Sequence, residues 1–385
     1  MRAREPLVLV NGIHAKTGGG RVYLEEVIPR VARIGRGVRY QVLVRPTQEA
    51  RLREAGVETV TVDPPEGPAG SFLWDQTALP WIAWRRGAAA VFTPANFGPI
   101  AIGRRSILLL RNTFEAAESW KGASARVRWR AMEWMSRLSV KSARGGLVVS
   151  DSFRRQIAAR FDVSPESLFV VHHGRSEIFR PAPQEGDGAA ARPDPYVLIV
   201  ADIYAHKNLV RAVEAFARAA ASRPGLRLAI AGGEVDAGYA AEVRARAAAL
   251  GLGERVAFLG SRPQTDLPGL YRRAVAALNP SLAETFGITQ VEAMACGAPL
   301  VAADIPVARE ICGGAALLVS PTDVAAMAAA LDRVLGDASL RAELSRKGIE
   351  RSAGFTWDRT AARLHEEVLR RLAELRDRKG TAQVP

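Results

Sequence analysis

The sequence has very little cysteine and no long apolar run. Its only two cysteines, Cys296 and Cys312, form no paired framework and lack the C-x-x-C spacing of metal or redox sites, which fits a reducing compartment. Nowhere do 18 consecutive apolar residues occur, the length that a membrane-spanning helix needs. The first residues, MRAREPLVLVNG, contain an apolar run of only four residues, too short for the core of a secretion signal. We therefore expect a cytoplasmic protein that does not cross a membrane.

Acidic residues are scarce in the first half of the chain. Residues 1–180 contain 28 Lys and Arg but only 16 Asp and Glu, whereas residues 181–385 contain 25 and 24. Such a one-sided basic balance predicts an anionic partner, which could be nucleic acid, a membrane surface or a phosphorylated substrate. A general habit of using Arg is the alternative, but that habit alone would not produce the asymmetry.

Short apolar runs alternate with amphipathic stretches along both halves. Examples are PLVLVN followed by GRVYLEEVIPRVARI, and YVLIVAD followed by NLVRAVEAFARAAAS. Runs of four to six apolar residues are typical of buried parallel strands, and repeated strand-helix units predict doubly wound α/β sheets. The stretch RPAPQEGDGAAARPDP, from Arg180 to Pro195, lacks periodicity and is the best candidate linker.

The length of 385 residues exceeds the usual size of a single hydrophobic core. The sequence therefore predicts an α/β protein with two Rossmann-like domains that face a cleft. We place an N-terminal domain over residues 1–183 and a C-terminal domain over residues 184–358. The closing stretch, residues 359–385, continues one long amphipathic helix.

Two glutamates stand in the stretch ETFGITQVEAMACG, which begins at Glu284 and ends at Gly297. The preceding AVAALNPS is predicted to be a strand and GITQVEAMACG a helix, so Glu284 falls in a loop at the carboxyl edge of a parallel sheet, where such sheets bind ligands. The amides around Gly287 would form a helix N-terminus suited to phosphate. Glu292 lies further along the helix, where its carboxylate could accept two hydrogen bonds from a diol such as ribose.

The longer stretch from Glu284 to Asp323 resembles the donor-site segment of family 4 retaining glycosyltransferases, which have the GT-B fold. The resemblance implies that Glu284 contacts the transferred sugar and that Glu292 binds the ribose of the nucleotide. It also places a group of neighbours near the diphosphate or the sugar, namely Phe286, Gly287, Ile288 and Thr289. A solvated surface with two chance glutamates is the alternative interpretation.

A second resemblance lies in YVLIVADIYAHKNLVRAVEAFA, which is similar to the opening strand and phosphate-binding lysine of the same family. Lys207 occupies the lysine position, where a cation would offset charge on the departing nucleoside diphosphate. The family often has an arginine shortly before this lysine, but here the residue is Asp202. Arg262, in LGSRPQTDLPGLY, is our candidate substitute. Taken alone, Lys207 could equally be a surface lysine at a helix start.

A glycine-rich loop, NGIHAKTGGGRVYLEE, follows the first predicted strand. Its spacing does not fit the G-x-G-x-x-G pattern of dinucleotide-binding proteins. Consecutive glycines nevertheless allow backbone amides to point at an anion. The family resemblance assigns Gly19 and Gly20 to the donor diphosphate, and Arg21 to the phosphates or the acceptor.

The stretch RSILLLRNTFEA matches a strand whose end, in the family, commonly carries a His-Asp pair beside the reacting sugar. Arg111 and Asn112 stand there instead. Their position at the end of a strand still favours side chains that face the cleft, and we count Asn112, Glu284 and Lys207 as candidate catalytic residues. Asn96, in the loop FTPANFGPI, is placed on the acceptor side with Arg21 and Arg111.

Metal binding is not expected from the histidines. His14 and the pair His172–His173 lack metal-ligand spacing with carboxylates or cysteines, so structural or cleft-lining roles are favoured. The donor segment contains no DxD-like pair, and together with the resemblance this predicts metal independence and no cofactor beyond the nucleotide sugar itself.

A basic stretch from Ser119 to Gly146 holds seven Lys and Arg, one Glu and three Trp. It could be a helix that lies on an anionic bilayer, or a helix whose aromatic residues pack on the sheet while its arginines face water. Nucleic-acid binding is disfavoured because no recognised motif accompanies the charge.

The resemblance implies a metal-independent, retaining hexosyltransferase with a nucleotide-diphosphate sugar as donor and a glycan or lipid-linked acceptor. We expect a role in bacterial cell-surface polysaccharide synthesis, such as that of lipopolysaccharide or capsule, with peripheral attachment to the inner face of the cell membrane as an option. The last helix should pack back on the N-terminal domain. The alternatives are an inactive GT-B protein that binds nucleotide or membrane, and an epimerase or phosphorylase on the same scaffold.

Overall fold

A computed structural model describes residues 5–15, 18–114, 123–182 and 195–381. The chain forms two compact units. Of the described residues, the first unit comprises 5–15, 18–114, 123–174 and 356–381, and the second comprises 175–182 and 195–355. The predicted boundary at 183/184 and most of the predicted linker lie outside the described residues, so the domain limits stay a prediction.

The first unit is built on a parallel sheet of seven strands in the order β3-β2-β1-β4-β5-β6-β7. The strands are β1 (Leu7–Asn11), β2 (Arg39–Val44), β3 (Thr59–Thr61), β4 (Ala90–Thr93), β5 (Ser106–Leu110), β6 (Gly146–Val148) and β7 (Leu168–Val170). Every residue of β1 and β5 is buried, as expected for strands covered on both faces.

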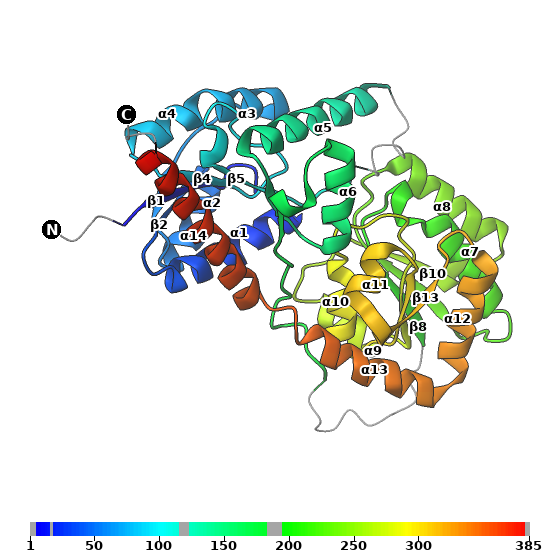
Figure 1. The fold of residues 1–385 in the computed structure, drawn as a ribbon. Coiled ribbons are helices and arrows are strands. Elements are labelled where there is room, and N and C mark those ends of the chain that lie inside the picture. The colour runs from blue at the N-terminus through cyan, green and yellow to red at the C-terminus, as the bar shows by residue number, and fades with distance from the viewer. Residues whose placement is uncertain (1–4, 16–17, 115–122, 183–194, 382–385) are drawn as a thin grey trace. The chain divides into compact units, whose positions relative to one another are not determined.

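Helices of the first unit come from both ends of the chain. They are α1 (Gly18–Ile34), α2 (Pro46–Glu54), α3 (Gly67–Gln76), α4 (Ala78–Arg85), α5 (Ala123–Ala143), α6 (Asp151–Phe161) and α14 (Trp357–Thr381). Helix α14 packs beside α1 (Figure 1). Tyr40 Oη and His365 Nδ1 are 2.8 Å apart, and Arg30 forms an ion pair with Asp358. The prediction that the last helix packs on the N-terminal domain is therefore confirmed.

The second unit contains a parallel sheet of six strands in the order β10-β9-β8-β11-β12-β13. The strands are β8 (Tyr196–Val200), β9 (Arg227–Ala231), β10 (Val256–Gly260), β11 (Ala276–Asn279), β12 (Leu300–Ala303) and β13 (Ala316–Val319). Its α-helices are α7 (Leu209–Ala219), α8 (Ala237–Ala249), α9 (Leu267–Arg273), α10 (Ile288–Ala295), α11 (Pro306–Cys312), α12 (Val324–Gly336) and α13 (Ala338–Ser352).

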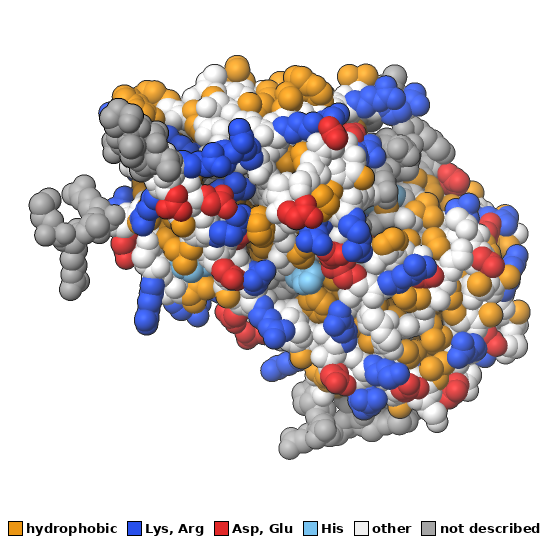
Figure 2. Space-filling model, in the orientation of Figure 1, with side chains coloured by type: hydrophobic (Ala, Val, Ile, Leu, Met, Phe, Trp, Pro, Cys, Tyr) orange, Lys and Arg blue, Asp and Glu red, His pale blue; other side chains and the backbone are white. Residues whose placement is uncertain are grey.

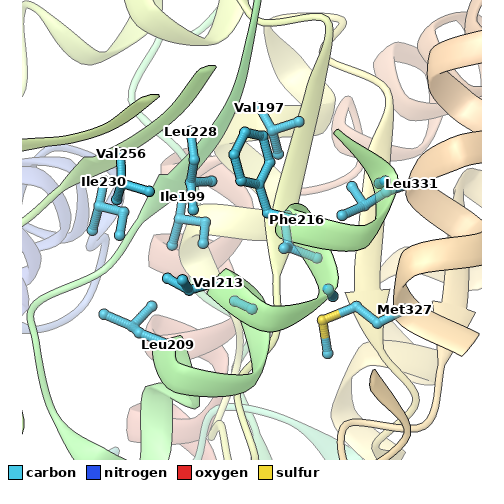
Figure 3. Packing of buried hydrophobic residues seen from close by; sticks show 14 of the residues in the cluster. Val197, Ile199, Leu209, Val213, Phe216, Leu228, Ile230, Val256, Met327 and Leu331 are labelled. Carbon is cyan, nitrogen blue, oxygen red and sulfur yellow. The ribbon is translucent and has the colours of Figure 1, made fainter. Parts of the chain in front are cut away.

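The core of the second unit follows from the amphipathic pattern of α7. Leu209, Val213 and Phe216 recur at helical spacing and are fully buried against the strands and against Met327 and Leu331 of α12 (Figure 3). Burying each such side chain contributes roughly 1.5–3 kcal/mol, so this face of the helix fixes its position on the sheet.

Both sheets reverse their winding direction at one point, between β1 and β4 in the first and between β8 and β11 in the second. Open parallel sheets bind ligands at the carboxyl ends of the strands that flank such a point. The loops that follow β1, β4, β8 and β11 are therefore the places to look for a site. The predicted pair of parallel, doubly wound sheets is confirmed.

Candidate active site

The loops after β8 and β11 carry the two predicted catalytic residues of the second unit and bring them together. Lys207 Nζ donates a hydrogen bond of 2.7 Å to Glu284 Oε1, and both side chains are largely buried. The two loops are also fastened through their backbones, because Leu282 N donates to His206 O at 2.8 Å and Asn208 Nδ2 donates to Pro280 O at 3.0 Å. A lysine and a carboxylate are thus fixed at the sheet edge predicted for ligand binding.

The Lys207–Glu284 pair keeps the carboxylate charged. Burial by itself would raise the pKa of Glu284, but the charge of Lys207 and hydrogen bonds from Lys207 and Ser281 outweigh it, so the pKa lies below its usual value. Burial, with help from the charge of Lys207, lowers the pKa of the neighbouring His206 to about 4. At neutral pH the two loops therefore present the Lys207–Glu284 ion pair beside an uncharged imidazole.

Helix α10 begins immediately after this loop, at Ile288, with Thr289 as its second residue. Gly287 precedes it with a φ of 82°, in the left-handed region that favours glycine, and a Cβ there would lie 2.6 Å from Gln290 Oε1. Thr289 Oγ1 accepts a hydrogen bond of 3.1 Å from Asn279 Nδ2, which ties the first turn to the end of β11. The amides at such a helix start can bind an anion, as predicted for Gly287, Ile288 and Thr289.

The side chain of Phe286 does not face a ligand site. It is buried, and its ring meets that of Phe355 edge to face with a centroid distance of 5.6 Å. Any contact of Phe286 with a donor would therefore come from its backbone.

Glu292 lies inside α10 and is buried. Burial raises the pKa of this carboxyl to about 8, although a hydrogen bond with Gln264 acts in the opposite direction. Gln264, in the loop after β10, was missed from the sequence. It stands in the same LGSRPQTDLPGLY stretch that suggested Arg262, but nothing in that stretch alone indicates its partner.

Arg262 lines an open cavity of about 900 Å³ in the second unit. Other charged residues of its wall are Glu177, Arg180, Asp266, Arg272 and Arg273. This arginine-rich wall suits an anion, but no contact joins Arg262 to Lys207 in the described part of the unit.

Asp202, which stands where the family often has an arginine, has a structural role. Its Oδ1 accepts a hydrogen bond of 2.7 Å from Gly233 N and so anchors the loop after β9.

In the first unit, Asn96 organises the end of β5. Its Oδ1 accepts hydrogen bonds from the backbone nitrogens of Arg111, at 2.9 Å, and Asn112, at 3.2 Å. Asn96 is itself buried, whereas the side chain of Asn112 is exposed. Asn96 therefore positions these two residues, and its buried side chain is less suited to touching an acceptor directly.

Arg111 and Gly20 are in close contact at the start of α1. A Cβ on Gly20 would overlap Nη2 of Arg111, so a side chain larger than hydrogen would displace the guanidinium. A Cβ on Gly19, by contrast, would meet no atom within 4 Å. Burial lowers the pKa of Arg111 from its ordinary value, but an arginine keeps its charge. A cation thus lies at the positive end of a helix, an arrangement that favours an anion.

A buried aromatic cluster, formed by Tyr23, His173 and Trp357, surrounds this region of the first unit. The ring centroids are separated by 5.5 Å for Tyr23 and His173, 6.1 Å for Tyr23 and Trp357, and 5.9 Å for His173 and Trp357. Burial raises the pKa of Tyr23 and lowers that of His173 to about 3, with the charge of Arg111 assisting the shift of His173. These side chains remain uncharged at neutral pH. No local sequence pattern predicts the cluster, because its members lie far apart along the chain.

Arg21 and His14 are engaged elsewhere in the first unit. Arg21 Nε donates a hydrogen bond of 2.7 Å to Glu25 on the exposed side of α1. His14 Nε2 and Asn11 Nδ2 both contact the buried carboxylate of Asp75, at 2.7 and 2.9 Å. The preference for a structural role of His14 agrees with this contact.

Within the described ranges no cluster of three His, Cys, Asp or Glu could hold a metal ion. Metal independence itself stays a prediction.

Comparison with known proteins identifies the domain that holds the Lys207–Glu284 pair. Residues 184–351 match the family described as glycosyl transferases group 1. Over this range, which contains Lys207 and Glu284, the chain is similar to group 1 glycosyltransferases. The family resemblance predicted from the sequence is therefore confirmed.

A D-inositol 3-phosphate glycosyltransferase from Mycobacterium marinum is 35% identical over 222 residues, which are 56% of this chain and 47% of that protein. The chain spans about half the length of the curated relatives it matches.

Two solved structures are similar over nearly the whole chain. A sucrose-phosphate synthase from Thermosynechococcus elongatus has a TM-score of 0.76 at 19% identity, and the match covers 96% of this chain and 100% of that one. Anabaena HepE, solved in complex with UDP-glucose, has a TM-score of 0.73 at 18% identity, with 94% and 99% covered. These similarities show the fold, which is GT-B as predicted.

Proposed function

We propose that this protein is a retaining glycosyltransferase that takes a sugar from a nucleotide-diphosphate donor. The observation that carries the proposal is the Lys207–Glu284 ion pair at the strand reversal of the group 1 domain, directly ahead of the start of α10. It combines a cation and a helix N-terminus for a diphosphate with a carboxylate for sugar hydroxyls. HepE, which shares the fold, binds UDP-glucose.

In this mechanism Lys207 and the amides near Gly287 stabilise the negative charge that builds up on the departing nucleoside diphosphate. Glu284 holds the transferred sugar and Glu292 the ribose. An acceptor oxygen bonds to the anomeric carbon on the face from which the phosphate oxygen leaves, which retains the configuration. The leaving phosphate takes the proton of the acceptor hydroxyl, so no protein base is required.

The first unit would supply the acceptor side. Arg111, held over Gly20 at the start of α1, offers a positive charge beside the exposed Asn112. We assign to it an acceptor that carries negative charge, and a lipid-linked or polymeric glycan of a bacterial cell surface, as in lipopolysaccharide or capsule synthesis, fits this chemistry. A small phosphorylated polyol is the second candidate, because the 35% identical relatives are named for D-inositol 3-phosphate.

The donor half is tested by thermal-shift binding against UDP, GDP, ADP, dTDP and their common sugars, followed by an assay for nucleotide release. We expect one nucleotide to raise the melting temperature of the wild type, and the shift to be lost in Glu292→Ala. Glu350→Ala is the matched control, because Glu350 is an exposed helical glutamate of the same unit whose carboxylate pairs with Arg346.

The outcomes separate the proposal from its rivals. Binding without nucleotide release, in the presence of candidate acceptors, would favour an inactive GT-B protein. Turnover that requires free phosphate would favour a phosphorylase, and a changed sugar without an acceptor would favour an epimerase. Full activity in the presence of a chelator is expected if transfer needs no metal, and a large, reproducible loss would contradict that part of the proposal.

A further inference from the structure

Three tryptophans of the first unit are more exposed than a side chain of this size usually is. Trp81 and Trp84 on α4 are 54% and 72% exposed, and Trp134 on α5 is 62% exposed. Leu73 on α3 and Val127 on α5 are also exposed. Single exposed apolar residues need no explanation, but a group of them indicates a surface that binds something. We name this group, carried by α3, α4 and α5, the tryptophan face.

The helices that carry the tryptophan face meet at one turn. Gln76, the last residue of α3, bonds to the backbone of Gly98 and Ile100, and Ser139 and Ser142 of α5 bond to the same two residues. Helix α4 begins two residues after Gln76, at Ala78. Figure 2 shows apolar side chains gathered along the upper edge of the first unit, over α3, α4 and α5, with Lys and Arg beside them. These bonds hold the end of α3 and the last turns of α5 at the same turn, and the exposed apolar residues are carried by α3, α4 and α5.

The charge beside the tryptophan face is positive. Arg85 lies over the ring of Trp81, with its guanidinium carbon 5.0 Å from the ring centroid. On α5, the exposed residues Arg126, Arg128 and Arg130 form no ion pair with an acidic residue in the described part of the chain. The carboxylate of Glu133, on the same helix, is bound by Arg160. Exposed indole rings with unneutralised arginines beside them match the chemistry of an anionic lipid surface, whose headgroup region accommodates both.

We propose that the tryptophan face binds an anionic lipid bilayer, with Trp81, Trp84 and Trp134 in the headgroup region and the arginines of α5 on lipid phosphates. No helix of the described residues is long and apolar enough to span a bilayer, so the contact is peripheral. Of the two interpretations of the basic stretch Ser119–Gly146, this favours a bilayer-facing outer side of α5, while Ser136, Ser139 and Val140 on its inner side are buried. The inference deepens the proposed function by favouring a lipid-linked acceptor.

The test is flotation of the full chain with vesicles of phosphatidylcholine, with and without about one third phosphatidylglycerol. We expect binding to the anionic vesicles only, a blue shift of tryptophan fluorescence on binding, and loss of binding at high salt. The double variant Trp81→Ser/Trp84→Ser and the triple variant Arg126→Gln/Arg128→Gln/Arg130→Gln should each reduce the partition coefficient at least tenfold. The control Leu369→Ser/Arg346→Gln removes one exposed apolar residue and one exposed arginine elsewhere and should bind as the wild type does.

Each remaining outcome overturns the inference. These are absence of binding to anionic vesicles, equal binding by the variants and the wild type, and binding to neutral vesicles that salt does not weaken. Tighter binding of single-stranded nucleic acid than of vesicles, lost in the same variants, would assign the face to nucleic acid. The variants are compared only after their melting temperatures match that of the wild type. Flotation needs no donor or acceptor, so it can fail while the transfer reaction stands, and the reverse also holds.

Discussion

The two strand reversals of this molecule hold their charges in different ways. At the β8/β11 reversal, Lys207 and Glu284 neutralise each other through a hydrogen bond of 2.7 Å. At the β1/β4 reversal, Arg111 lies against Gly20 near the uncharged Tyr23 and His173. Opposite charges that hold each other preorganise a site for a ligand with both polar and anionic parts. A cation beside a helix start and uncharged rings selects for negative charge.

The largest effect is expected from the Lys207–Glu284 pair. Lys207→Ala and Glu284→Ala should each lower kcat/KM by ~10²–10³-fold, because each removes a charged group from the reacting centre. The double variant should lose less than the product of the two single losses, because each single change leaves its partner's charge unpaired. Steady-state transfer rates measure both effects.

The pair Lys347–Glu343 is the matched control for this cycle, since it is a surface ion pair of the same unit with a similar distance of 2.6 Å. Its alanine variants should change kcat/KM by less than about twofold, in line with the small value of exposed ion pairs. Equal losses at both pairs would mean that Lys207 and Glu284 contribute only to stability.

The second effect tests the other reversal, through two adjacent glycines. Gly20→Ala should displace the Arg111 guanidinium and cost about 1–3 kcal/mol in acceptor binding or stability, whereas Gly19→Ala has space for its methyl group and should cost little. Acceptor KM and melting temperature are measured for both variants. If Gly19→Ala proved the more harmful change, the contact between Gly20 and Arg111 would not be what makes this position sensitive.

A separate effect concerns pH and Glu292. The folded pKa of about 8 lies above the ordinary value near 4.3, so the folded state binds the proton more tightly than the unfolded state. The contribution of Glu292 to the free energy of unfolding is therefore highest below pH ~4.3, falls as the pH rises towards 8 and is constant above it. Denaturant unfolding of the wild type and Glu292→Gln as a function of pH should show the slope in the wild type only.

Nucleotide binding adds a second readout for Glu292. If the ribose diol donates two hydrogen bonds to this carboxylate, binding favours the ionised form and releases a proton, so affinity should rise several-fold as the pH approaches 8. Calorimetric titrations in buffers of different ionisation enthalpy measure the released proton. A pH-independent affinity that is equal in Glu292→Gln would exclude this role.

The contrast between the two reversals also explains what could be predicted from the sequence. Lys207, Glu284 and the start of α10 follow local patterns. In each, an apolar strand is followed by a short loop and then by a helix, so the place of the residue in the fold can be predicted from its near neighbours in the sequence. The pairing of Arg21 with Glu25 follows a local rule as well, since residues four apart on a helix are neighbours, and this argues against an acceptor role for Arg21.

Other features depend on contacts between distant parts of the chain, which no local pattern predicts. Asp202, at a place where the family often has an arginine, accepts a hydrogen bond from the backbone of Gly233 in the loop after the neighbouring strand. Gln264 reaches Glu292 from another loop, and Tyr23 meets His173 and Trp357 from three separate segments. Tertiary packing decides these positions, and only the three-dimensional arrangement reveals them.

The position of α14 has a consequence for how this protein is made. The helix is near the end of the chain, yet it packs on α1 and supplies Trp357 to the aromatic cluster of the first unit. A ribosome therefore releases most of the first unit long before the residues that complete it. During synthesis, the surface of α1 that α14 later covers therefore stays uncovered and accessible to chaperones while the whole second unit is translated.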